Sequence, residues 1–287
     1  MLPSILICIY TILSQSLALV SGYSGQVSLA HAGFYGIGAY SAALITIHFT
    51  PNLFITIPSA ILITGLLARV IISIAVSTVD DYFIIITLGI QVLVFSLLNN
   101  WEGLTNGPLG LVDIQRPTIF GVSLESDVAF FVLAAIVAGL FWCFFRLLSN
   151  SPFGRILLAI REDEVLAESF GKDVRKARIS SFVISAVAAG CAGVLFSHLV
   201  TFIDPSSFTV DESIFILSIV IIGGMDNLNK TFFATVVMVL LPEILKLVGV
   251  SSEYAANLRQ ILYGLLLIIL AASLNRSQKQ RRKTYYD

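Results

Sequence analysis

The sequence contains little charge. Only 12% of its 287 residues are Asp, Glu, Lys or Arg, whereas 57% are hydrophobic. Soluble domains carry about 25% charged and about 45–50% apolar residues. So little charge cannot cover a water-exposed surface of this size, which excludes an ordinary soluble enzyme, and the hydrophobicity excludes a disordered chain. The mean hydropathy of +0.92 indicates a membrane protein with several spans.

Motifs for enzymatic chemistry are also lacking. The chain contains no HExxH, CxxC or GxSxG motif, and its three histidines lie far apart. Neither a metal nor a cofactor is therefore expected. Residues 224–231, GMDNLNKT, resemble a phosphate-binding loop, but Asn229 replaces the glycine before the lysine and an apolar helix precedes the segment. The chain is thus expected to be no enzyme and to hydrolyse no ATP itself.

The cysteine positions and the net charge give little further information on function. The three cysteines all lie in apolar runs, so they are interpreted as small buried hydrophobes rather than a disulfide framework. A net charge of −1 gives no indication of nucleic-acid binding.

Long apolar runs predict an all-α, polytopic integral membrane bundle of about nine transmembrane helices, some broken or short. A span needs about 20 apolar residues, and in lipid it must satisfy its own backbone hydrogen bonds. The run at 212–223 is about half a bilayer long and predicts a broken or tilted crossing helix. The predicted spans are 2–20, 28–48, 53–75, 82–99, 128–148, 179–200, 212–223, 231–248 and 258–273.

Basic residues orient these spans. Seven lie between Arg146 and Arg178, and five more lie in the tail 274–287. The positive-inside rule places both regions in the cytoplasm, so the N-terminus is expected outside and the C-terminus inside. The predicted organisation is a single transmembrane permease domain over 1–287, with a cytoplasmic loop at 149–178 and a basic cytoplasmic tail.

The loop 149–178 contains the signals of a helix over 152–170. Ser151 suits the N-cap, Pro152 the first helical position and Gly171 the position after the helix. Ile156, Ile160 and Ala167 are expected near one face of this helix, with Leu157 and Phe170 beside that face. Four consecutive charges, Arg161 to Glu164, are more acidic than a membrane anchor needs, because anionic lipid repels acids. The loop therefore fits docking of a protein partner, while the alternative is a solvated helix that only joins two spans.

Glycines and polar residues near the second span predict a pathway. Gly22 and Gly25 suit a break in the helix, where exposed backbone can line a cavity. Ser28 and His31 follow, and polar residues inside spans are costly. The alternative is close helix packing by small residues, which repeat every fourth position from Ser28 and again from Ala189.

A proton relay is a less favoured alternative in the spans, since a lone histidine is more often structural. It would use His31 or Glu243. Glu243 and Lys246 are spaced to pair on one helical face, directly after Pro242.

Several motifs together resemble the branched-chain amino acid ABC transporter permease family, and specifically the larger of its two permeases. They extend over nearly the whole chain in the expected order. They are GYSGQVSLAHAGF from Gly22, GIGAY from Gly36, NWEGLTNG from Asn100, SPFGR from Ser151, AIREDE from Ala159, the pair Gly223-Gly224, and YGL from Tyr263.

The resemblance implies a permease subunit that forms the path for leucine, isoleucine and valine in a bacterial cytoplasmic (inner) membrane. Its implied partners are the lipid bilayer, a second homologous permease, two ATP-binding subunits and an extracytoplasmic binding protein. The residues expected to contact the ATPase are Arg155, Arg161, Glu162, Asp163 and Glu164. Alternatives that stay open are a urea or short-amide permease of the same superfamily, a stand-alone ion-coupled transporter and a non-transporting scaffold.

The chain departs from the family pattern in two places. Asp226, Lys230 and Thr231 replace two glycines and a proline of the family's GGxGSxxGP turn. The family typically has more apolar sequence before GYSG, so the N-terminus is expected to be short by one or more spans.

Overall fold

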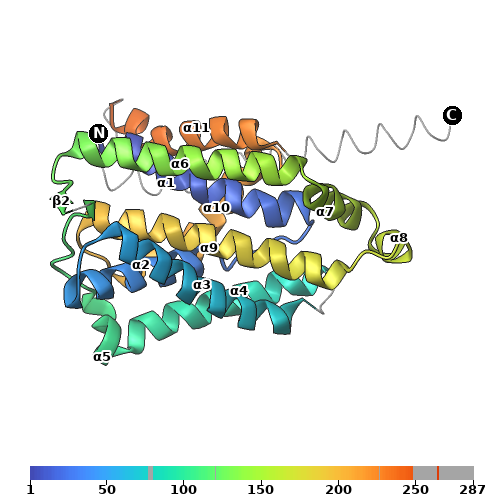
Figure 1. Cartoon of the computed structure of the whole chain (residues 1–287), viewed down its shortest axis with the longest axis horizontal. Helices are drawn as coiled ribbons and strands as arrows, with labels where there is room; N and C mark the ends of the chain where they lie inside the picture. The colour runs from blue at the N-terminus through green and yellow to red at the C-terminus, as the bar shows by residue number, and fades with distance from the viewer. Residues whose placement is uncertain (77–79, 120, 226, 248–263, 265–287) are drawn as a thin grey trace.

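The computed structural model describes residues 1–76, 80–119, 121–225, 227–247 and 264, and they form a bundle of helices that run along one common direction (Figure 1). The predicted all-α class is confirmed. The long helices are α1 (Leu2–Ala18), α2 (His31–His48), α3 (Leu53–Ala75), α4 (Asp80–Asn100), α6 (Asp127–Asn150), α9 (Val174–Val200), α10 (Val210–Gly223) and α11 (Leu228–Leu247).

Short elements connect these helices. A π-helical turn, Leu19–Tyr23, continues α1, and two 3-10 turns lie at Gly107–Leu109 and Pro205–Phe208. The remaining elements are α5 (Glu102–Thr105), α7 (Pro152–Glu162), α8 (Glu164–Ser169) and the antiparallel hairpin β1 (Thr118–Ile119) and β2 (Val122–Ser123).

Within the described residues, six helical segments are long and apolar enough to cross a membrane. They contain α1, α3, α4, α6, α9 and α10, and they establish a polytopic membrane protein. The predicted bounds of 53–75 agree with α3, whose start is fixed by Asn52 accepting from the Phe54 N–H at 3.0 Å. The predicted span at 258–273 and the tail at 274–287 lie outside the described residues, as does the side chain of Lys246.

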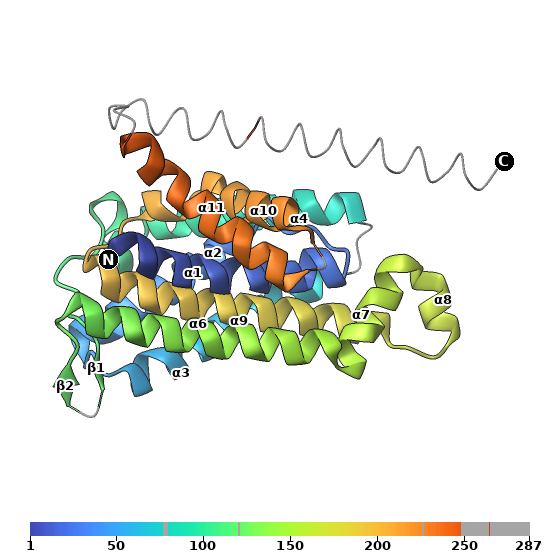
Figure 2. The same cartoon turned by 90° about the horizontal axis from the view of Figure 1, so that it is seen from above.

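The bundle has two distinct ends. One, here called the α7 end, is where α7 and α8 project beyond the other helices; the opposite one, the hairpin end, holds α5, β1 and β2 (Figures 1 and 2). The predicted half-length span is a crossing helix: Ile203, before α10, pairs with Leu111 of the hairpin-end loop, whereas Met225, after α10, lies against Gly22 at the α7 end.

The helices α1 and α9 form the centre of the bundle, while α3, α4 and α6 leave most of their surface exposed. Close packing of small residues joins α9 to α2. A Cβ at Gly38 would overlap Gly190, and one at Gly193 would overlap the backbone of α2. The close-packing interpretation of the small residues in α9 is therefore confirmed at these positions. Aromatic side chains also pack edge-to-face between these two helices, as Phe34 and Phe182 do, with their ring centroids 5.5 Å apart.

The second predicted span begins later than expected. Residues 24–30 are not helical, and α2 starts at His31 rather than near Ser28. The four-residue repeat from Ser28 is therefore not a single helical stripe. The reason is the polar environment at the start of α2, described below, which supplies hydrogen bonds to a backbone that has left the helix.

Candidate functional site

The projecting segment of α7 and α8 begins as predicted. The Ser151 Oγ accepts a hydrogen bond from the Gly154 N–H at 3.3 Å, and Pro152 occupies the first helical position. Both features favour a helix start, because the first N–H groups of a helix otherwise lack partners. The cap fixes the point at which α6 ends and the chain turns out of the bundle (Figure 1).

The prediction of a single helix over 152–170 is wrong, because Asp163 divides this segment into α7 and α8. This residue has an extended backbone, with φ −158° and ψ 106°, and its carboxylate accepts from the Leu166 N–H at 2.9 Å. Asp163 thus caps α8, since a short acidic side chain competes with the helix for backbone donors. The predicted end is confirmed, because Gly171 has φ +72° and its N–H bonds to the Glu168 carbonyl.

The break at Asp163 turns three apolar side chains outward. Val165, Leu166 and Phe170 are 74%, 54% and 75% exposed, and we call them the α8 patch. Of the predicted apolar face, Ile160 and Ala167 are buried, whereas Phe170 is exposed, since α8 does not continue the helix of α7. Exposed apolar side chains that gather in one place typically mark an interaction surface.

Three of the five predicted docking residues lie on the outside of this segment. Glu162 and Arg155 are exposed, and the Arg155 Nη1 donates to the Asn150 carbonyl at 3.2 Å. Asp163 is exposed as well, although its carboxylate caps α8.

The other two predicted docking residues also contact distant parts of the chain, although Arg161 is itself exposed and the Glu164 side chain is partly exposed. The Arg161 Nη1 donates to the Gly22 carbonyl at 2.6 Å, so it links the end of α7 to the turn that ends the first helix. The Glu164 carboxylate pairs with Arg178 of α9 at 3.0 Å. Both contacts border a cavity of about 360 Å³ that Ser21, Ser24 and Met225 also line.

The predicted break is confirmed at Gly25, which lies in the non-helical segment, whereas Gly22 is still in the π-helical turn that continues α1. A Cβ at Gly22 would collide with the Met225 carbonyl, and Gly25 has φ +77°, which L side chains rarely adopt. A Cβ at Gly25 would also lie 3.1 Å from the Arg161 side chain. Glycine at both positions therefore lets the chain leave the helix while α7 and the turn after α10 approach closely.

Side chains from other helices satisfy the backbone at the break. The Leu29 N–H donates to the Thr87 hydroxyl at 3.1 Å, the Ala32 N–H to the Ser213 hydroxyl at 3.0 Å and the Gly33 N–H to Gln91 Oε1 at 2.6 Å. Gln91 in turn donates to the Phe208 carbonyl at 2.7 Å. Such partners are needed because lipid offers none, so irregular backbone is tolerated only inside the protein.

His31 is buried at the start of α2 between two hydroxyls. Its Nε2 lies 2.9 Å from the Ser16 Oγ of α1 and 3.2 Å from the Ser185 Oγ of α9. Ser16 donates to the Leu13 carbonyl, and Ser185 donates to the Ser16 carbonyl. Since both hydroxyl protons are used, the Nε2 of His31 is the donor to them. His31 therefore ties three helices together, and the neighbouring Ser28, also buried, bonds to the Ala30 N–H.

Four polar residues of this centre were not singled out from the sequence. Gln91 links the start of α2 to the 3-10 turn at Pro205–Phe208. Glu212, in the first turn of α10, accepts a hydrogen bond from the Tyr10 hydroxyl at 2.6 Å. Gln15 and Gln26 are fully buried, and their amides have no hydrogen-bond partner among the described residues. The available signal was a glutamine or glutamate inside an apolar run, which is costly in a membrane.

Comparison with known proteins decides the family. A family model described as the permease component of branched-chain amino acid transport systems matches residues 4–271. The chain belongs to this family. The predicted resemblance is thereby confirmed.

Named relatives support the same conclusion. The chain is 33% identical to the high-affinity branched-chain amino acid transport system permease protein LivM of Escherichia coli (strain K12), over 83% of this chain and 61% of that protein. It is 31% identical to a probable LivM permease of Methanocaldococcus jannaschii, over 53% of this chain and 49% of the relative.

A more distant relative is the autoinducer 2 import system permease protein LsrC of Klebsiella pneumoniae, 28% identical over 52% of this chain and 41% of that protein. The chain spans about three fifths of the length of the Escherichia coli relative, 61%. No solved structure matches the chain.

Proposed function

We propose that this chain is the permease subunit of an ATP-driven importer, and that it forms the membrane path for leucine, isoleucine and valine. The observation that carries the proposal is the family match over residues 4–271, together with the 33% identity to the LivM permease. ATP is hydrolysed by separate subunits, and this chain supplies the path and the mechanical link.

The proposed assembly contains a second homologous permease, two ATP-binding subunits and an extracytoplasmic binding protein. Its location is the bacterial cytoplasmic membrane, with the α7 end in the cytoplasm. The basic residues of the loop 149–178 support this orientation through the positive-inside rule. The outward-facing apolar surfaces of α3, α4 and α6 support a place in the bilayer.

The docking site proposed for the ATPase is the outer surface of α7 and α8. It combines the α8 patch with the exposed charges of Arg155, Glu162 and Asp163. An apolar centre with a charged rim is the usual anatomy of a protein interface. Because this segment projects beyond the bundle (Figure 2), a partner can reach it without contacting the spans.

The link from docking to transport is proposed to pass through Arg161 and Glu164. Arg161 binds the Gly22 carbonyl and Glu164 binds Arg178, so the segment is fastened both to the break after α1 and to α9. A movement of docked α7 is therefore transmitted to both helices. The segment of α7 and α8 is proposed to have two positions, one for each state of the path. ATP binding drives transport if the ATPase has different affinities for these two positions.

The path is proposed to follow the break, along Gly22, Gly25, Ser28 and His31. The buried amides of Gln15 and Gln26 support this location, because a buried amide without a partner costs free energy that a passing polar group recovers. An amino acid has charged ammonium and carboxylate groups, and these need such partners to replace water.

Uptake of labelled leucine into proteoliposomes tests the function. The chain, reconstituted with its neighbouring permease and ATPase subunits and with loaded binding protein outside, is expected to accumulate leucine only with ATP inside. Unlabelled valine and isoleucine should compete, whereas urea should not. Uptake by this chain alone that an uncoupler abolishes would contradict the proposal and identify an ion-coupled transporter.

A further inference from the structure

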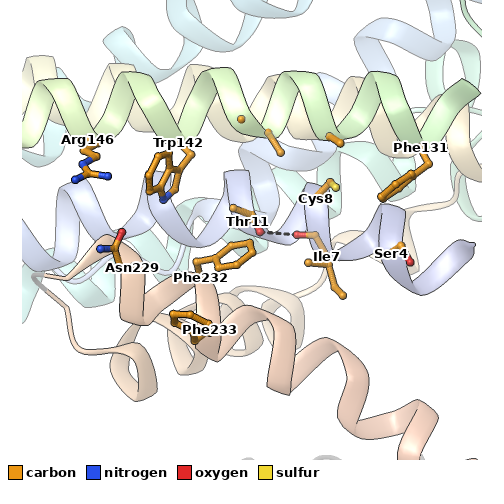
Figure 3. A pocket seen from close by; sticks show the side chains of 13 residues that line it. Ser4, Ile7, Cys8, Thr11, Phe131, Trp142, Arg146, Asn229, Phe232 and Phe233 are labelled. Carbon is orange, nitrogen blue, oxygen red and sulfur yellow. Dashed lines mark hydrogen bonds between the residues drawn. The ribbon is translucent and has the colours of Figure 1, made fainter.

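A groove on the exposed flank of the bundle is apolar along most of its length and carries a positive charge at one end, which matches the acyl chain and the phosphate of a phospholipid. It lies between α1, α6 and α11 and has a volume of about 740 Å³. Most of its lining is apolar, including Ile7, Phe131 and Phe232. The Thr11 hydroxyl in its wall donates to the Ile7 carbonyl at 2.6 Å, so it offers no free donor to the groove (Figure 3).

The polar groups of the groove gather at its α7 end. Figure 3 shows Arg146, Trp142 and Asn229 together at this end, with Phe131 and Ser4 at the other. The Arg146 guanidinium lies 5.1 Å from the centre of the Trp142 ring. In the described part of the chain no carboxylate pairs with Arg146, and no acidic side chain lines the groove.

This end of the groove lies near the end of α6, one of the helices long and apolar enough to cross a membrane. Arg146 is four residues from Asn150, where α6 ends and the chain turns out of the bundle. Tryptophan and arginine are typical of the boundary between the hydrocarbon and the headgroups. Lys230, which follows Asn229 in the sequence, is exposed but does not line the groove.

We propose that the groove binds an anionic phospholipid of the α7-side leaflet, with its phosphate at Arg146 and an acyl chain against α1 and α6. Charge complementarity favours this occupant over the chain's own predicted last span, 258–273. That span leads directly into the basic tail, which would bring further positive charges to the end of the groove that Arg146 already lines.

Fluorescence of Trp142 measures the occupant directly. The chain has two tryptophans, so Trp101→Phe in the full-length protein leaves Trp142 as the only one. The protein is reconstituted in phosphatidylcholine vesicles in two parallel samples. One sample contains brominated phosphatidylglycerol, and the other contains brominated phosphatidylcholine at the same mole fraction. Brominated phosphatidylglycerol should quench Trp142 with about fivefold higher apparent affinity, the factor expected for one basic side chain near an anionic lipid.

Two matched variants locate the headgroup site. Arg146→Gln should reduce the preference for phosphatidylglycerol to a ratio near one. Arg69→Gln should leave it unchanged, since Arg69 is an equally exposed arginine near the α7 end of α3 and does not line the groove. Equal quenching by both lipids before mutation would overturn the proposal. Quenching by neither would overturn it too, because a protein segment would then cover the groove. None of these readings depends on transport.

Discussion

Arg161 is the residue on which the proposed coupling depends. It belongs by sequence to a charged surface turn, but its guanidinium binds the backbone of Gly22, which lies 139 positions away in the sequence. The contact joins α7 to the π-helical turn in which the first helix ends. It differs from the contact of Arg155, whose side chain bonds, among the described residues, to Asn150 at the end of α6.

Arg161→Gln is expected to uncouple transport from ATP hydrolysis. Leucine uptake by the reconstituted complex should fall by about tenfold, the factor that corresponds to the loss of a hydrogen bond from a charged group. The ATPase subunits should still co-purify, because the α8 patch is untouched.

Lys172→Gln is the matched control for Arg161→Gln. Lys172 is an exposed cation of the same loop whose side chain has no bond to any of the described residues, and its replacement should change neither uptake nor ATPase binding. Loss of the ATPase from the Arg161→Gln protein would show that Arg161 is a docking residue instead. Normal uptake would show that the contact with Gly22 has no function.

At the scale of elements, α8 is the part expected to bind the ATPase. Leu166→Ser with Phe170→Ser should reduce the amount of co-purified ATPase by at least about tenfold, because two exposed apolar side chains lose their burial in the interface. Their exposure means that the bundle itself should be unaffected. The measurement is the ratio of ATPase to permease after affinity purification in mild detergent.

Leu109→Ser is the control for this pair. Leu109 is 75% exposed, the same fraction as Phe170, but it lies at the hairpin end. If it lowers ATPase recovery as much as the α8 variant does, the effect is not local to the docking segment.

Local signals were sufficient to predict the starts and ends of several elements. Ser151, Pro152 and Gly171 predicted where the docking segment starts and ends, and Gly22 and Gly25 predicted the break. In each case the determinant is a property of one residue: a capping oxygen, a fixed φ or the absence of a Cβ. Such properties can be read without knowing what lies nearby.

The remaining features depend on contacts that the sequence does not display. Asp163 could continue a helix or cap the next one, and the structure has the cap. The start of α2 is determined by Gln91 and Ser213, whose positions are 58 and 181 residues from their partners. The contact of Arg161 with the Gly22 carbonyl was hidden because a charged turn is typical of a solvated surface.

At the scale of the whole molecule, the arrangement separates two tasks. The spans surround a polar centre in which the N–H groups of Leu29, Ala32 and Gly33 are bonded to side chains of other helices. The segment of α7 and α8 projects at one end of the bundle (Figure 2). In the proposed function, this segment responds to a partner in water while the path stays inside the bilayer.

The central claim is that this chain works only as one subunit of an ATP-driven assembly. Purification of the tagged chain from its native membrane in mild detergent, followed by identification of the co-purifying proteins, tests it most directly. A second, related permease and ATP-binding subunits should be recovered with the chain. Recovery of the chain alone, under conditions that keep a known ATP-driven importer intact, would show that it is not a subunit of such an assembly.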